Sequence, residues 1–206
     1  LLIRTVKENN VVQIIALGFA HRERHRIFIS ISVGVIYKNI NNEAIKFGEA
    51  NRLKYYNPME CIHIGYLMPQ KDYHAWYFEL NGDPQAIEDN IRDVASTIIQ
   101  YGFPYLEMLS NEDNLINEID KTSTTNYKGR IIPIIYHMRN EKERALQYIE
   151  ESIKKISKGF TKEDYESAKR LAGEGGHFVM VENNALKYYM EFVENFKRIL
   201  NEENRD

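Results

Sequence analysis

Cysteine and tryptophan are the scarcest residues of this 206-residue chain, which has one of each. The single thiol, Cys61, cannot form a disulfide within the chain, so we expect a protein of a reducing compartment, the cytoplasm. The sequence also lacks any run of about 18 apolar residues, and we therefore expect no membrane-spanning helix and no membrane partner. It opens LLIRTV, with neither Met nor the pattern of a signal peptide, so we expect it to begin part-way into a longer protein.

An excess of charge of one sign is also missing, because the formal net charge is only -3. A strongly basic protein attracts nucleic acid or an acidic membrane, and we expect neither as a partner here. Residues 1–80 hold 10 Lys or Arg against 7 Asp or Glu, whereas residues 81–206 hold 17 against 23. The first half is thus mildly basic and the second half mildly acidic, which is too weak an asymmetry to indicate a ligand.

Motifs with a known chemistry are missing as well. The patterns H-E-x-x-H, G-x-S-x-G and D-x-[DN]-x-[DN]-G do not occur. The glycine-rich GEGGH at 173–177 lacks the spacing of a phosphate-binding loop, and we interpret it as a helix end followed by a linker. We therefore expect no cofactor.

The clearest structural signal is IFISISVGVIY at 27–37, where apolar residues occupy every second position. This alternation is typical of a β-strand with one buried face. Similar patterns predict strands over 1–7, 11–19, 61–67 and 74–80. The first three strands should form an antiparallel meander and the last two a hairpin. The residues expected to share one core are Ile29, Ile31, Val33, Trp76 and Phe78.

The character of the chain changes at Asp83, a good N-cap that precedes Pro84. Helical spacing predicts a helix from Pro84 that ends at Gly102 and Pro104, and another within 112–120. TSTTN at 122–126 has the composition of a linker. We therefore expect an α+β fold with an antiparallel sheet of about five strands backed by helices. The sheet domain should cover 1–121 and a helical-hairpin region, packed on it, 127–206.

Helical periodicity continues in this C-terminal region. One helix should begin after Asn140, one should run from Thr161 to near Gly173, and one should cover about 184–200. A lone helix of that last length is marginal in water, so we expect it to pack on a surface. The preceding helix or a second copy of the chain can supply that surface. The inward-facing residues should be Tyr189, Phe192, Val193, Phe196 and Leu200.

HRERHR at 21–26 is the densest cluster of charge. Alternation at a strand end would put Arg22, Arg24 and Arg26 on one side, as an anion or phosphate site requires. The alternative is a solvated hairpin tip, which we favour because charged clusters usually mark exposed turns.

Glu60, Cys61, His63 and His74 are the residues best suited to a metal. In the predicted hairpin His74 lies opposite Leu67, four residues from His63, which separates the two histidines by about 13 Å along the strands. Ligands of one zinc ion must converge within about 2.3 Å of the metal. We therefore expect no metal site, and we expect Cys61 to be a small buried side chain rather than a nucleophile.

Several segments together resemble a known family. A strand with Trp76 is followed by a helix from Pro84 and by FPYLEMLSNEDNL at 103–115, and VVQIIAL precedes IFISISVGV in the meander. This combination resembles an uncharacterised bacterial family, domain of unknown function 4304, over roughly the first 120 residues. The resemblance implies a bacterial source and an α+β fold, and it supplies no catalytic residues.

These observations favour a binding module without catalytic activity, of an immunity-type or regulatory kind, that binds a protein partner. The alternative is an enzyme or small-ligand binder whose site is assembled from scattered residues. A homodimer through the C-terminal helices is compatible with either function. A deep polar pocket would favour the enzyme and a broad exposed patch the binding module. The candidate site residues are His21, Arg22, Arg24, His63 and Tyr66.

Overall fold

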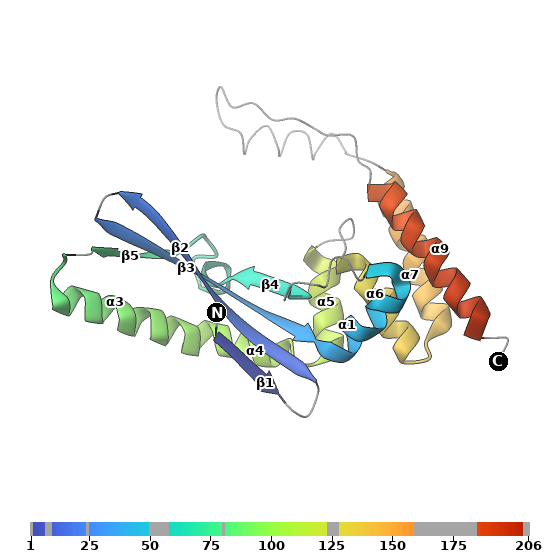
Figure 1. Cartoon of the computed structure of the whole chain (residues 1–206), viewed down its shortest axis with the longest axis horizontal. Coiled ribbons are helices and arrows are strands. Elements are labelled where there is room, and N and C mark those ends of the chain that lie inside the picture. Colours follow the sequence, from blue (N-terminus) through green and yellow to red (C-terminus); the bar gives the residue numbers. More distant parts are fainter. Residues whose placement is uncertain are drawn as a thin grey trace, which may run out of the picture. The chain divides into compact units, whose positions relative to one another are not determined.

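The chain forms two compact units, whose elements are labelled in Figure 1. The computed structural model describes residues 2–6, 10–23, 25–49, 58–79, 81–122, 128–158 and 185–203; for 2–6, 22–23, 49, 122, 128 and 185 it describes the backbone alone. The first unit comprises Leu1–Asn42 and Asn51–Ile119, and the second Glu43–Ala50 and Asp120–Asp206. Among the helices of the described segments, none combines the length and the apolar character needed to span a bilayer.

The first unit contains a five-stranded antiparallel sheet, which with the helices confirms the predicted α+β fold. Strand β3 lies at its centre and pairs with β2 on one side and with both β4 and β5 on the other. Strand β1 pairs with β2 and completes the expected meander (Figure 1). The strands are β1 (Leu2–Val6), β2 (Val11–Glu23), β3 (Arg26–Tyr37), β4 (Glu60–His63) and β5 (Ala75–Glu79).

The predicted hairpin of 61–67 with 74–80 is wrong. Strand β4 ends at His63, and Ile64–Leu67 forms a short 3₁₀ helix, η3. Because β3 is 12 residues long, it pairs with β4 through Ser32–Val35 and with β5 through Arg26–Ser30. The two short strands thus follow one another along β3 and do not pair with each other.

The pleat of β3 divides the sheet into two faces. Val33 and its neighbours in phase lie on the face that helices cover, which we call the helix face. There Trp76 of β5 donates its indole N–H to the Asp93 carboxylate at 2.7 Å, and the Tyr37 hydroxyl donates to the Leu109 carbonyl at 2.9 Å. We call the opposite face the open face, although Val12, Ile14 and Ile36 form a small buried cluster on one part of it. The helical elements that follow β5 are α3 (Pro84–Thr97), η4 (Ile98–Gly102), α4 (Phe103–Met108) and α5 (Glu112–Thr122).

Helix α3 begins where the sequence predicted, because Asp83 caps it by accepting the Gln85 N–H at 3.2 Å. The predicted end at Gly102 is wrong. The backbone stays helical through η4, a π-helical turn, and into α4. Gly102 is buried here, and a Cβ at this position would lie 3.4 Å from side-chain atoms of Val33 and Ile64. An alanine methyl at position 102 would therefore be in ordinary van der Waals contact with these two side chains.

The expected core residues lie on the helix face. Ile31 and Val33 are fully buried and Trp76 nearly so, whereas Ile29 and Phe78 are half-buried. Ile29 pairs directly with Trp76 across the β3–β5 ladder, so their side chains share a face. The predicted core is confirmed for Ile31, Val33 and Trp76, whereas Ile29 and Phe78 share this face but are buried only in part.

The second unit is built from helices. Its described elements are η2 (Ile45–Glu49), which follows α1 (Lys38–Ala44), then α6 (Lys128–Met138), α7 (Lys142–Ser157) and α9 (Ala185–Glu203). Helix α9 packs on α7 and η2, as expected for an amphipathic last helix. The predicted helix of 161–173 and the GEGGH segment lie outside the described residues. The five apolar residues predicted to face inward from α9 are all buried: Tyr189, Phe192, Val193, Phe196 and Leu200.

Candidate functional site

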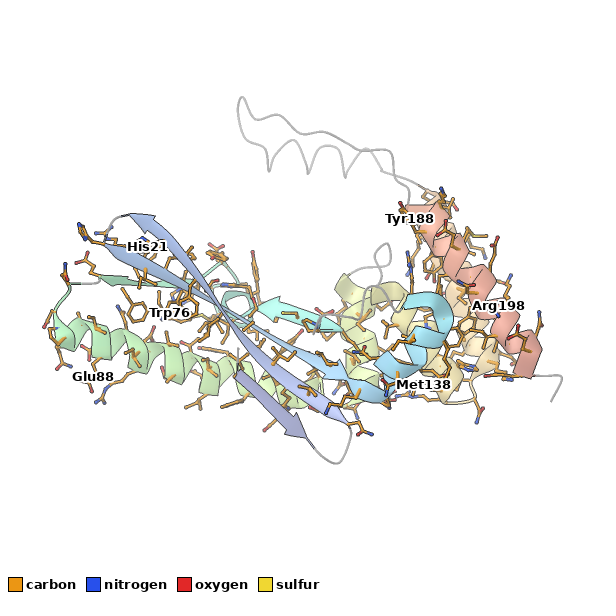
Figure 2. The ribbon with its side chains drawn as sticks, in the orientation of Figure 1. His21, Trp76, Glu88, Met138, Tyr188 and Arg198 are labelled. Carbon is orange, nitrogen blue, oxygen red and sulfur yellow. The ribbon has the colours of Figure 1, made fainter. Side chains whose placement is uncertain are left out.

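The cluster HRERHR lies at the tip of the β2–β3 hairpin, and His21 is exposed there (Figure 2). A bulge interrupts the ladder between His21 and Glu23. Arg26 pairs with Glu79 at 3.1 Å, and both side chains are more than half exposed. The side chain of Arg22 and the whole of Arg24 lie outside the described residues, so the anion site, the less favoured of the two interpretations, is not tested.

His63 and Tyr66 do lie together, in a row of rings that begins on β3. Phe28 of β3 stands opposite Tyr77 of β5, and their rings meet edge to face at 5.3 Å. Phe28 also stacks on Tyr73 at 6.1 Å, and Tyr73 stacks on His63 at 4.3 Å. His63 then contacts Tyr66 edge to face at 6.0 Å. We call these five residues the aromatic surface.

The aromatic surface belongs to the open face of the sheet. Phe28 and His63 alternate with the core residues of their strands, and His63 pairs with Ser32. Phe28 is 7% exposed and forms the buried base of the surface, whereas Tyr66, Tyr73 and Tyr77 are 48%, 50% and 55% exposed. Large aromatic side chains that stay half exposed in one cluster are unusual on a protein surface and mark interaction sites.

His63 has a defined protonation state. Its Nδ1 accepts the Gly65 N–H at 3.2 Å and so caps η3. Burial, and secondly the neighbouring His74, lower the pKa of His63 from the ordinary 6.5. The imidazole is therefore neutral at pH 7 with its proton on Nε2. This Nε2 is buried and has no hydrogen-bond partner among the described residues.

The hairpin on which the expected separation of about 13 Å between His63 and His74 depended is not formed. The loop after η3 folds back, and a Cβ on Gly65 would lie 2.7 Å from the His74 backbone nitrogen. The pleat nevertheless separates the four candidate ligands, since Glu60 faces the helices whereas Cys61 and His63 face the other way. The described segments contain no group of three or more His, Cys, Asp or Glu that could hold a metal ion.

The candidate residues do not form one site, because they lie at two separate positions on the sheet. His21 pairs with Ile27 and His63 with Ser32, five residues further along β3, which is roughly 17 Å. His21 also follows the phase of the helix face, whereas His63 lies on the open face. A single site that contains both histidines is therefore not formed. Cys61 is partly exposed rather than buried.

Sequence reasoning missed three members of the aromatic surface, although two of them left a signal. Phe28 lies on the side of IFISISVGVIY whose next three positions are Ser30, Ser32 and Gly34, with Ile36 at its end. Tyr77 likewise lies out of phase with Trp76 and Phe78. A large aromatic residue on the polar side of two strands is the signal, and the strand pairing brings both together. Tyr73 lies in a loop and left none.

A polar group also lies within the helix face. Glu60 is fully buried and its Oε1 accepts the Cys61 N–H at 3.2 Å. Gln13, also buried, donates to the Ser110 hydroxyl at 3.0 Å. Burial, and then the charges of Glu60 and Glu118, raise the pKa of Tyr105 well above its ordinary range. This phenol is therefore uncharged at neutral pH.

Comparisons with known proteins add no assignment, because no family model, no curated protein and no solved structure matches the chain. The resemblance to domain of unknown function 4304 stays a prediction.

Proposed function

We propose that this chain is a non-catalytic binding module, of an immunity-type or regulatory kind, that takes a protein partner on the aromatic surface. The observation that carries the proposal is the exposure of Tyr66, Tyr73 and Tyr77 around Phe28 and His63. Tyrosine is enriched at the centre of protein interfaces, where it buries a large apolar ring and still offers a hydroxyl.

The rings are held in place before any partner binds. Tyr73 lies between Phe28 and His63, and each contact restricts its side-chain torsions. A tyrosine that is already ordered loses less conformational entropy on binding than a free one. The hydroxyls of Tyr66, Tyr73 and Tyr77 make no hydrogen bond to a described residue, so they are available to a partner. Both properties favour the burial of these rings in an interface.

The charge of the aromatic surface favours a protein over a nucleic acid. None of its five members is Lys or Arg, and the lowered pKa of His63 leaves the imidazole neutral at pH 7. Binding of single-stranded nucleic acid combines aromatic stacking with a positively charged groove along the phosphates. The aromatic surface supplies the rings without the positive charge.

Site-specific photo-cross-linking tests the proposal. A benzophenone side chain at position 73 should capture one partner in cells of the source organism, because this residue lies at the centre of the surface. The matched control has the same side chain at position 188, where Tyr188 of α9 is also a half-exposed tyrosine (Figure 2). The captured protein must differ from whatever the control captures. A toxin encoded next to this chain would be the first partner to test in purified form.

Binding of the purified partner then tests the surface itself. We expect the double change Tyr66→Ser and Tyr73→Ser to weaken the affinity at least about ten-fold, since central tyrosines are frequent hot spots. Tyr188→Ser should leave the affinity unchanged. Titration calorimetry measures both. An affinity that the double change does not alter, in a variant that still folds, would contradict the proposal.

A further inference from the structure

One imidazole holds the exposed part of the aromatic surface together. Besides accepting the Gly65 N–H at 3.2 Å through Nδ1, the ring of His63 stacks on Tyr73 at 4.3 Å and meets Tyr66 edge to face at 6.0 Å. Tyr73 in turn stacks on Phe28 of β3 at 6.1 Å. His63 therefore caps η3 and supports the two tyrosines on either side of it.

The position of Tyr73 depends on the backbone that His63 caps. The loop after η3 returns so closely over Gly65 that a Cβ at this position would collide with the Asp72 carbonyl oxygen. Asp72 directly precedes Tyr73, and its carboxylate accepts the Tyr73 N–H at 2.6 Å. A movement of Gly65 away from His63 therefore displaces the backbone that positions Tyr73.

This arrangement is incompatible with a charged His63. Nδ1 accepts a hydrogen bond only in the neutral imidazole, because both nitrogens of an imidazolium are donors. The new Nδ1–H would face the Gly65 N–H. Nε2 is already buried without a hydrogen-bond partner among the described residues. The charged ring would thus hold two buried donors without an acceptor, which is costly.

The surroundings of His63 also oppose its charge. Cys61 lies two residues earlier on the same face of β4, and the rings of Tyr66 and Tyr73 contact the imidazole. The face of Tyr73 would attract a cation. Burial, and secondly the neighbouring His74, outweigh this attraction, since together they lower the pKa of His63 from 6.5. The neutral ring is therefore the form that the folded surface requires.

We propose that proton uptake by His63 releases the partner from the aromatic surface. This inference rests on the proposed function and adds the control of the same site by pH. While His63 is neutral, the cap on Gly65 keeps Tyr73 between Phe28 and the imidazole. Once His63 is charged, the cap is lost and Tyr73 is no longer held in the order that the partner meets. Because one proton is taken up, the affinity decreases below about pH 6.5 by at most ten-fold per pH unit.

Nuclear magnetic resonance of the chain alone tests this control without a partner. From about pH 7.5 to about pH 5.0, the amide of Gly65 and the ring protons of Tyr73 should shift with the midpoint of the His63 imidazole. In His63→Asn both signals should stay constant, because the Asn side-chain oxygen can accept the Gly65 N–H and does not titrate. His25→Asn, at the exposed hairpin tip, should keep the wild-type curve. Wild-type signals of Gly65 and Tyr73 that stay constant while His63 titrates overturn the proposal.

Titration calorimetry with the partner captured by cross-linking tests the release itself. Between about pH 7.5 and about pH 5.0, the wild-type chain should lose at least about three-fold more affinity than His63→Asn. This comparison removes any effect of groups that titrate on the partner. An equal change in both chains overturns the proposal and leaves the binding surface intact. If no partner is captured, the proposed function fails, whereas the resonance titration still decides whether the charge of His63 controls the aromatic surface.

Discussion

At the scale of single residues, His63 connects the local fold with the aromatic surface. Its Nδ1 caps η3, and its ring stacks on Tyr73, so one side chain holds both the helical turn and the loop that follows. Only a neutral imidazole can accept the Gly65 N–H at Nδ1. Protonation would turn this acceptor into a donor and remove the cap. The order of the aromatic surface therefore depends on the charge of His63.

This dependence predicts that the chain becomes less stable as the pH is lowered. The pKa of His63 in the folded chain is lowered from 6.5, so the unfolded chain takes up the proton first as the pH falls. The stability that neutral His63 contributes is complete above about pH 6.5 and decreases below it. Urea unfolding from about pH 7.5 to about pH 5.5 should show this decrease in the wild type and a smaller one in His63→Gln. His25→Gln, at the exposed hairpin tip, is the control, and equal slopes for all three chains would contradict the prediction.

At the scale of elements, local periodicity predicted most strands and helices, because an amphipathic element shows its buried face in its own sequence. Strand β3 and helix α9 are the strongest cases. The pairing of β4 and β5 could not be obtained in this way. Alternation over 61–67 is real in the sequence, but whether two strands pair with each other or with a third depends on contacts between distant residues.

The candidate site likewise combines residues that the sequence indicated with contacts that only the tertiary structure provides. His63 and Tyr66 were selected from the sequence, but Tyr73 joins them only because the loop after η3 folds back over Gly65. A Cβ on Gly65 would collide with the Asp72 carbonyl oxygen and with the His74 backbone. This close backbone approach is a tertiary property that periodicity does not contain. It also explains why a glycine is required within η3.

Alanine substitutions at two buried glycines, Gly65 in η3 and Gly102 in η4, test whether the close backbone approach at Gly65 is specific. Gly65→Ala should lower the free energy of unfolding by about 1–3 kcal/mol, because backbone atoms must move to admit the methyl group. In Gly102→Ala the new methyl would be in ordinary contact with Val33 and Ile64, and alanine favours a helix over glycine by about 1 kcal/mol. This second variant should therefore be as stable as the wild type or more stable. Urea denaturation compares them, and a similar loss in both would show that the approach at Gly65 is not specific.

At the scale of the whole molecule, each of the two units has fully buried side chains of its own. Ile31 is fully buried in the first unit and Phe196 in the second. Phe47 comes from the short segment between β3 and β4, yet its ring stacks on Phe196 at 4.9 Å. The contact of Phe47 with a helix about 150 residues further along the chain explains why local pattern could not assign Glu43–Ala50 to the helical unit.

Two core truncations should show whether each unit opens on its own. Phe196 contacts Phe47, His137 and Phe192, all within the second unit, so Phe196→Ala should speed amide hydrogen exchange chiefly in α6, α7 and α9. Ile31→Ala should act chiefly on β2, β3 and α3. Each change removes a fully buried side chain and should cost roughly 2–5 kcal/mol within its own unit. Exchange read by mass spectrometry resolves the two halves of the chain. If either variant speeds exchange equally in the sheet and in the helices, the two units unfold as one cooperative structure, and the separation of the cores has no thermodynamic counterpart.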